Sequence, residues 1–186
     1  MHWPVAVRTV KPATTTEAAV FESIKMPMHH VWPQMEALVE KGLAKSIGLS
    51  NFNVQMMWDL LSYCKIKPVA NEIEINPYIA QTELVRFCFG HGILPIAYCP
   101  IARGANLGPN GNLLELDIVK NLAQKYRKSP AQVLLSYGLS RGYSIIPKSQ
   151  NFERQVENFD IFDFKLRDEE IEELSKLNIG ARICNK

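Results

Sequence analysis

The chain alternates short apolar stretches with amphipathic ones, a pattern typical of βα units around a parallel sheet. Apolar runs predict strands over residues 44–49, 69–75, 93–98 and 143–147. Helical periodicity predicts helices over residues 28–41, 54–64, 82–90, 114–126, 130–141, 153–159 and 168–177. Residues 5–27 are expected to be irregular, with a candidate helix cap at Thr14, Thr15 and Thr16. The fold class is therefore α/β.

Two of these helices have clear boundary signals. The helix over residues 28–41 stops at Gly42, since glycine readily takes the backbone conformation of a helix end. Ser129 and Pro130 occupy the N-cap and first positions of the helix over residues 130–141. The first helix gathers apolar residues on one face: Val31, Met35, Leu38 and Val39.

The turn after the strand over residues 143–147 predicts an anion site. Lys148 and Ser149 stand at the carboxyl end of this strand, and Asn151 is placed to cap the helix that follows. The planar fork of Arg154 can grip two oxygens while Lys148 supplies a point charge. This combination suits a nucleotide phosphate. An ordinary strand-turn-helix with solvated charges is the alternative that this segment alone leaves open.

Composition and charge exclude several classes of partner. The chain has 21 basic and 19 acidic residues, so its net charge of +2 gives no reason to expect nucleic acid or a membrane as partner. No signal sequence is visible, and no apolar run reaches the roughly 18 residues needed to span a bilayer. We therefore expect a cytoplasmic protein. The four cysteines lack metal-ligand spacing and are expected to be reduced thiols: Cys64, Cys88, Cys99 and Cys184.

Several further apolar stretches end in polar or aromatic residues. They are His2-Trp3-Pro4, Ile47 to Phe52, Val69 to Tyr78, and Ile96 to Pro100. With the phosphate turn they occur in the same order as in the aldo-keto reductases, which the chain resembles from His2 to about Arg182. The resemblance implies a (β/α)8 barrel that reduces aldehydes or ketones with NADPH.

Length limits how much of such a barrel the chain can form. A complete barrel typically needs about 250 residues, and this chain has 186. If His2-Trp3-Pro4 ends the fourth strand, the first three strands and most of the fourth lie upstream of Met1. We therefore expect one incomplete domain over residues 1–186, a partial TIM barrel with about strands 4 to 8 and their helices. Its open edges predict self-association.

In a barrel of parallel strands the chemistry gathers at the carboxyl ends. We therefore expect one pocket lined by the side chains at these ends: His2, Ser50, Asn51, Glu72, Tyr98, Lys148 and Ser149. Ser50 and Asn51 can hydrogen-bond an amide such as the nicotinamide carboxamide, and Tyr98 offers a flat face for the ring. A core aromatic under a loop is the alternative for Tyr98.

The resemblance implies a role for each residue that matches the family's cofactor contacts. Those implied to hold the nicotinamide end are Ser50, Asn51, Glu72, Tyr98, Pro100 and Ile101. The family usually has Gln where this chain has Glu72. Those implied to hold the adenosine 2'-phosphate are Lys148, Ser149 and Arg154, with Glu157 and Asn158 at the adenine. This set favours NADPH over NADH.

The loop over residues 100–112 follows Tyr98 and is rich in glycine. Its length suits a flap over a ligand, with a plain surface loop as the alternative. Arg103 in this loop could reach the pyrophosphate or remain solvated.

Catalysis is the part of the function that the chain supports least. The resemblance implies that His2 orients a small carbonyl substrate and that Trp3 forms a pocket wall. The family's proton donor is a Tyr activated by a Lys and an Asp, all three preceding that histidine. We expect this chain to lack them, and Tyr78 is the obvious substitute. A noncatalytic NADPH-binding or assembly module is therefore the alternative to a reductase.

Overall fold

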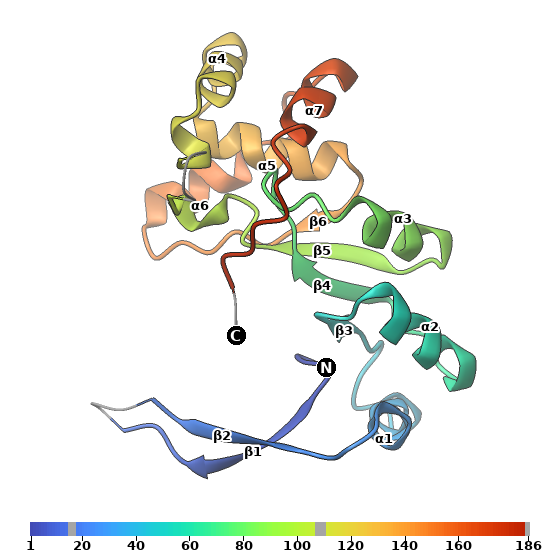
Figure 1. Ribbon diagram of the computed structural model, residues 1–186. Helices are drawn as coiled ribbons and strands as arrows, with labels where there is room; N and C mark the ends of the chain where they lie inside the picture. The colour runs from blue at the N-terminus through green and yellow to red at the C-terminus, as the bar shows by residue number, and fades with distance from the viewer. Residues whose placement is uncertain (15–17, 107–110, 185–186) are drawn as a thin grey trace. The chain divides into compact units, whose positions relative to one another are not determined.

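The computed structural model describes residues 1–14, 18–106 and 111–184, and it divides the chain into two compact units, Met1–Asn71 and Glu72–Lys186. Strands and helices alternate along most of the chain, as predicted (Figure 1). Among the residues in these described ranges, no helix combines the length and apolar character needed to cross a bilayer.

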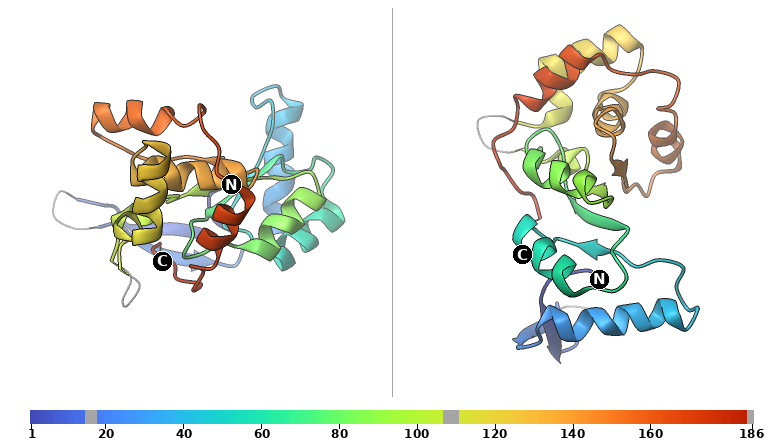
Figure 2. Two further views of the ribbon diagram at one scale, coloured as in Figure 1. Left: turned by 90° about the horizontal axis from the view of Figure 1, so that it is seen from above. Right: turned by 90° about the vertical axis from the view of Figure 1, so that its right-hand side faces the viewer.

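The first unit begins with an antiparallel hairpin and continues with alternating helices and strands. Its elements are β1 (Ala6–Lys11), β2 (Val20–Ile24), α1 (Met28–Glu40), β3 (Leu49–Ser50), α2 (Val54–Tyr63) and the start of β4 (Ala70–Glu74). Helix α1 is continuous although Pro33 lies inside it (Figure 2). The Asn53 side chain caps α2 by accepting a hydrogen bond from the Met56 amide at 2.9 Å.

The hairpin corrects the expectation that residues 5–27 are irregular. Ala6 pairs with Ile24, and the Arg8 guanidinium lies 2.7 Å from the Glu22 carboxylate across the strands. Nearly every residue of both strands is exposed, so neither face has the apolar pattern that marks a half-buried strand. The main-chain ladder rather than a buried face therefore defines this element.

The most buried residues of α1 lie outside the predicted apolar face, whose Val31, Met35 and Val39 are half-buried. Trp32 and Glu36 are buried, whereas Leu38 is 38% exposed. The Glu36 Oε1 atom accepts hydrogen bonds from the amides of Lys65 at 2.7 Å and Ile66 at 2.9 Å. The Trp32 indole donates to the Ile66 carbonyl at 3.0 Å. The carboxylate is buried because it satisfies main-chain amides of the loop after α2.

The second unit carries the rest of β4 and the larger core. Its further elements are α3 (Thr82–Gly90), β5 (Leu94–Tyr98), η1 (Ala102–Gly104), η3 (Leu113–Glu115), α4 (Asp117–Tyr126), α5 (Pro130–Ser140), β6 (Ser144–Ile145), α6 (Phe152–Phe159) and α7 (Asp168–Ser175). Strand β5 lies between β4 and β6 (Figure 1). Strands β5 and β6 are parallel, with Ala97 opposite Ile145. Their carboxyl ends, and the residues that follow them, therefore share one edge of the sheet.

Helix α5 confirms the predicted start at Ser129 and packs closely on β6. The Ser129 hydroxyl accepts from the Gln132 amide at 3.2 Å, and the Gln132 side chain accepts from the Ser129 amide at 2.9 Å. A methyl group at Gly138 would come within 2.7 Å of the Ile145 side chain. Glycine at this position therefore allows the close approach of helix and strand.

Some predicted boundaries are wrong. The strand expected over residues 44–49 is observed only at Leu49–Ser50, and so shares one residue with the prediction. The strand expected over residues 143–147 shortens to Ser144–Ile145, and His2-Trp3-Pro4 lies in no strand of the described chain. The helix expected from residue 114 starts at Asp117, because Leu116 has extended φ and ψ of −64° and 137°. Of the proposed threonine cap, Thr14 lies outside any helix, and the other two threonines lie outside the described residues.

Candidate functional site

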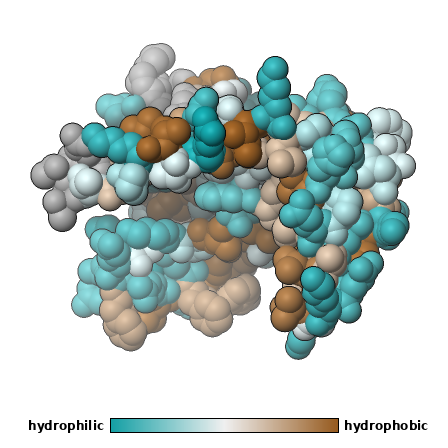
Figure 3. All heavy atoms as spheres, turned by 90° about the horizontal axis from the view of Figure 1, so that it is seen from below, coloured by the Kyte–Doolittle hydropathy of each residue, from teal (hydrophilic) through white to brown (hydrophobic). Residues whose placement is uncertain are grey.

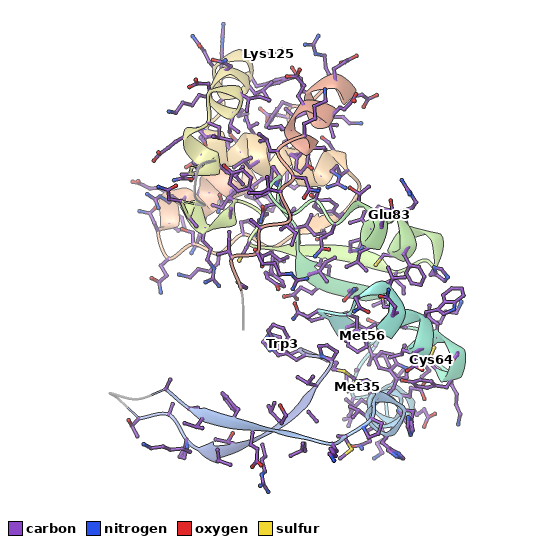
Figure 4. The ribbon with its side chains drawn as sticks, viewed as in Figure 1. Trp3, Met35, Met56, Cys64, Glu83 and Lys125 are labelled. Carbon is purple, nitrogen blue, oxygen red and sulfur yellow. The ribbon has the colours of Figure 1, made fainter. Side chains whose placement is uncertain are left out.

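The first unit brings together four of the predicted site residues. The Asn51 side-chain amide donates to the His2 carbonyl and to the Ser50 hydroxyl, both at 3.0 Å. The rings of His2 and Trp3 stack with centroids 5.7 Å apart and an interplanar angle of 28° (Trp3 is labelled in Figure 4). Asn51 has a φ of 63°, in the left-handed region that asparagine tolerates better than most residues.

Asn71 fixes the chain just after Ser50 and Asn51 and is not among the site residues predicted from the sequence. Its side chain is fully buried, accepts from the Phe52 amide at 3.4 Å and donates to the Phe52 carbonyl at 2.9 Å. An asparagine within an apolar strand is the signal that could have identified it, since a buried amide needs several partners.

In the second unit, Tyr98 ends β5 and is half-buried. Burial, together with the nearby Glu74 carboxylate and Cys184, raises the pKa of Tyr98 to about 12, although Arg182 opposes the shift. The ring is therefore a neutral phenol at physiological pH. A neutral phenol is poorly suited to act as a base, and stacking on the nicotinamide ring stays a prediction.

Glu72 lies in the middle of β4, two residues before the strand ends. The expectation that it stands at the carboxyl end is therefore wrong. Successive side chains of a strand point to opposite faces, so Glu72 and Glu74 share one face. Glu74 is only 1% exposed, whereas Glu72 is half-buried.

Glu74 holds the C-terminal segment and is not among the site residues predicted from the sequence. Its carboxylate oxygens accept hydrogen bonds from the amides of Ile183 at 2.8 Å and Cys184 at 3.1 Å. The Tyr78 carbonyl accepts from the amides of Ile179 at 3.1 Å and Ala181 at 3.2 Å. A second glutamate on the same face of an apolar strand is a signal that could have identified it, since buried carboxylates need hydrogen-bond donors.

The residues after Tyr98 form a tight turn. The Ala102 amide donates to the Cys99 carbonyl at 2.9 Å, and the Asn76 side chain donates to the same carbonyl at 3.2 Å. Pro100 is buried and Ile101 is half-buried. These contacts position the start of the proposed flap. Residues 107–110 of that loop lie outside the described residues, so the flap stays a prediction.

The predicted phosphate turn has the expected cap. The Asn151 side chain accepts from the Arg154 amide at 2.9 Å, which confirms Asn151 as the N-cap of α6. The Ser149 hydroxyl accepts from the Asn151 amide at 3.1 Å, and the Gln155 side chain donates to the Ser149 carbonyl at 2.9 Å. The turn is therefore held by its own hydrogen bonds.

Lys148 and Arg154 are exposed on this turn. Within the part of the chain that the structure describes, neither cationic group makes an ion pair or a side-chain hydrogen bond. Glu157 and Asn158 follow on the same helix and are half-buried. The Glu157 carbonyl accepts from the Gln132 side chain at 3.2 Å, which ties α6 to α5.

Tyr78, the candidate replacement for the proton donor, lies in the core of the second unit. It is fully buried, and its hydroxyl donates to the Gly111 carbonyl at 3.1 Å. Burial raises the pKa of its phenol. A buried phenol with a raised pKa is poorly suited to proton transfer to a substrate, so the structure gives Tyr78 a structural role.

The predicted site residues thus fall into two groups, one in each unit. A single pocket lined by all of these residues would need side chains from both units, so the expected pocket stays a prediction. In the described ranges, no group of three or more His, Cys, Asp and Glu side chains is arranged to hold a metal ion.

Comparison with known proteins gives consistent matches over almost the whole chain. Residues 1–179 match the Aldo/keto reductase family. Aldose reductase B of Dictyostelium discoideum is 41% identical over an alignment of 190 residues. The alignment covers 99% of this chain and 60% of that protein. Aldose reductase C of the same organism is also 41% identical, with 58% of its length covered. The chain thus spans about 60% of the length of these curated relatives.

Solved structures of the same kind match the fold. An aldose reductase from Schistosoma japonicum has a TM-score of 0.85 and 36% identity, covering 98% of this chain and 58% of that one. A Bombyx mori aldo-keto reductase in complex with NADP has a TM-score of 0.87 and 34% identity, covering 100% and 58%. The predicted fold class, part of a (β/α)8 barrel with a parallel sheet, is confirmed.

Proposed function

Because this chain belongs to the aldo/keto reductase family, we propose that it binds NADPH as part of an enzyme that transfers hydride to an aldehyde or ketone. The observation that carries this proposal is the capped turn between β6 and α6, which presents Lys148, Ser149 and Arg154 together. One silkworm relative was solved in complex with NADP and another in complex with NADPH.

The turn suits the adenosine 2'-phosphate for electrostatic reasons. A phosphate monoester carries about −1.5 to −2 charges at pH 7. The two exposed cations at the turn can approach it without first breaking an ion pair to a described residue. Each hydrogen bond to a charged group contributes about 1.5 to 3 kcal/mol. NADH lacks this phosphate, so the turn should discriminate against it.

The other predicted residues complete the proposed cofactor site. Tyr98 stacks on the nicotinamide with Pro100 and Ile101 beside it, and the carboxamide meets Ser50, Asn51 and Glu72. Glu157 and Asn158 contact the adenine. His2 orients the carbonyl substrate, and Trp3 forms a wall of its pocket.

The experiment is a fluorescence titration of the 186-residue chain with NADPH and with NADH. We expect tighter binding of NADPH and weaker binding at high salt, because surface charges are screened. Arg154→Ala should weaken NADPH binding by about 10- to 100-fold and leave NADH binding almost unchanged. Arg86→Ala is the matched control, since Arg86 is an exposed arginine on another helix, α3. Equal affinity for the two cofactors would overturn the proposal.

A second function, cofactor binding without turnover, is favoured by the position of Tyr78. We infer that the chain as given lacks the Tyr, Lys and Asp of the family's proton-transfer machinery. The buried Tyr78 hydroxyl is bound to a main-chain carbonyl and does not offer a replacement. The same chain would then bind NADPH without oxidising it when an aldehyde is added.

A further inference from the structure

Two cysteines that are distant in the sequence meet beside Tyr98. The sulfur atoms of Cys99 and Cys184 lie 3.6 Å apart, although the two residues are 85 positions apart in the sequence. Both residues are thiols, and both are half-buried. Cys99 follows β5 directly, and Cys184 lies in the segment after α7.

Neighbouring side chains, and not only the two thiols, hold the main chain on each side of this sulfur contact. Glu74 accepts hydrogen bonds from the amides of Ile183 and Cys184 at 2.8 and 3.1 Å. Its buried carboxylate therefore holds the segment after α7 beside the carboxyl end of β5. On the other side, the Asn76 side chain holds the Cys99 carbonyl at 3.2 Å. Both thiols are therefore positioned by main-chain contacts that would persist if the sulfur atoms were changed.

The geometry permits a covalent bond after a small movement. A disulfide has a sulfur separation of about 2.05 Å, so the two atoms must approach by about 1.5 Å. Residues 178–184 contain no helix or strand, and a segment of this kind can adjust by that amount without breaking a ladder of hydrogen bonds.

We propose that Cys99 and Cys184 form a two-electron oxidation site, which a hydroperoxide converts to a disulfide and a dithiol reductant restores. The thiolate of one cysteine attacks a peroxide oxygen, the O–O bond breaks, and a sulfenic acid and an alcohol (or water) result. The thiol of the other attacks the sulfenic sulfur, forms the S–S bond and releases water. The pair loses two electrons and two protons, and the peroxide takes up both.

The order of the two steps follows from the surroundings of Cys99. Burial raises the pKa of the Cys99 thiol to about 11, although a hydrogen bond from the Arg103 guanidinium opposes the shift. Little Cys99 thiolate is therefore present at neutral pH. Cys99 is therefore poorly suited to the first attack on the peroxide, since thiolates are the nucleophiles in this chemistry, and we assign it to the second step.

The disulfide would tie the C-terminal segment to the end of the strand that carries Tyr98. An effect of this bond on NADPH binding rests on the proposed function, whereas formation of the bond does not. The test therefore reads the cysteines directly. Failure of cofactor binding and failure of disulfide formation are then separate results.

The experiment treats the reduced 186-residue chain with a small excess of hydrogen peroxide and then blocks remaining thiols under denaturing conditions. We expect the number of thiols per chain to fall from the four present to two, with the loss of two hydrogen atoms by mass spectrometry. Peptide mapping should find one cross-linked pair containing Cys99 and Cys184 within a single chain. Addition of dithiothreitol should restore all four thiols.

Three serine variants make the result specific. Cys99→Ser and Cys184→Ser should each abolish the intrachain disulfide. Cys64→Ser, which replaces another half-buried cysteine (labelled in Figure 4), should oxidise like the unaltered chain. A different cysteine pairing, a disulfide between chains, or overoxidation of Cys184 with Cys99 still a thiol would overturn the proposal. If a variant misfolds, peptide mapping of the unaltered chain still shows whether Cys99 and Cys184 are the residues joined by the disulfide.

Discussion

At the residue scale, the buried acidic side chains of this protein are held by main-chain donors. Glu36 binds two amides of the loop after α2, and Glu74 binds two amides of the C-terminal segment. Glu170 accepts from the Arg167 amide and from the side chains of Lys125 and Tyr126. A buried carboxylate is costly unless it is paired in this way, so each of these residues organises a specific stretch of chain.

Glu170 leads to a prediction about pH. Burial alone would raise the pKa of its carboxyl group, but the hydrogen bonds from Lys125, Tyr126 and the Arg167 amide outweigh burial and lower the pKa from 4.5 to about 2. The folded state therefore binds this proton less readily than the unfolded state. The stabilisation is complete above about pH 5 and is lost as the pH falls toward 2.

Glu170→Gln should lower the free energy of unfolding at pH 7 by about 1.5 to 3 kcal/mol. The loss relative to the unaltered chain should shrink at pH 3. Glu169→Gln, an exposed position in the same first turn of α7, serves as control and should change little. Urea unfolding followed by circular dichroism at the two pH values measures both. An equal loss at pH 7 and pH 3 would contradict the assignment.

Glu72 carries a second prediction, which rests on the proposed cofactor site. An ionised Glu can only accept hydrogen bonds, whereas a Gln can also donate, and the carboxamide of nicotinamide offers both a donor and an acceptor. Glu72→Gln should therefore tighten NADPH binding by a few-fold or leave it unchanged, as measured by fluorescence titration. Glu83→Gln on α3 is the control (Glu83 is labelled in Figure 4). Clear weakening on Glu72→Gln would show that the glutamate itself is needed.

At the element scale, the strand-to-helix turn before α6 depends on one capping side chain. Asn151→Ala removes the acceptor for the Arg154 amide and should cost about 1 kcal/mol of stability. Because this cap orders the residues proposed to hold the phosphate, NADPH affinity should also fall. Asn151→Ser keeps a capping oxygen and should restore most of both losses. Unchanged NADPH affinity in the alanine variant would show that the proposed phosphate site does not depend on the Asn151 cap.

At the scale of the whole molecule, the chain covers 60% of one curated relative and 58% of another. Parallel strands are apolar on both faces, and a barrel removes its sheet edges only by closing. Figure 3 shows apolar patches among polar ones on one face of the surface. The exposed large apolar side chains of the chain include Val7, Phe21, Trp58 and Phe162. If these 186 residues fold alone, such surfaces should favour association.

We therefore predict that the purified 186-residue chain self-associates and does not reduce aldehydes at a rate near that of an intact relative. The absence of general acid catalysis alone typically lowers the rate by about 10² to 10⁴. Light scattering measures the mass, and oxidation of NADPH with a reactive aldehyde measures turnover. A soluble monomer with a cooperative melt and rapid turnover would refute this prediction and require a different proton donor.

The sequence by itself determined most of the helices and the family. Local periodicity and capping residues placed α3 over Thr82–Gly90 and the N-cap of α5 at Ser129, because these signals act between residues within one helical turn. The motifs at the strand ends identified the aldo-keto reductases, and the cap at Asn151 followed from its position alone.

Only the tertiary structure decided which distant residues meet. Glu74 and Cys184 are 110 positions apart, and Tyr78 and Gly111 are 33 apart, so no local pattern relates them. The hairpin β1–β2 escaped detection because its strands bury neither face and therefore lack a period in hydropathy. Contacts of this kind depend on where the whole chain places each backbone segment, whereas sequence periodicity reports only which face of a single element is apolar.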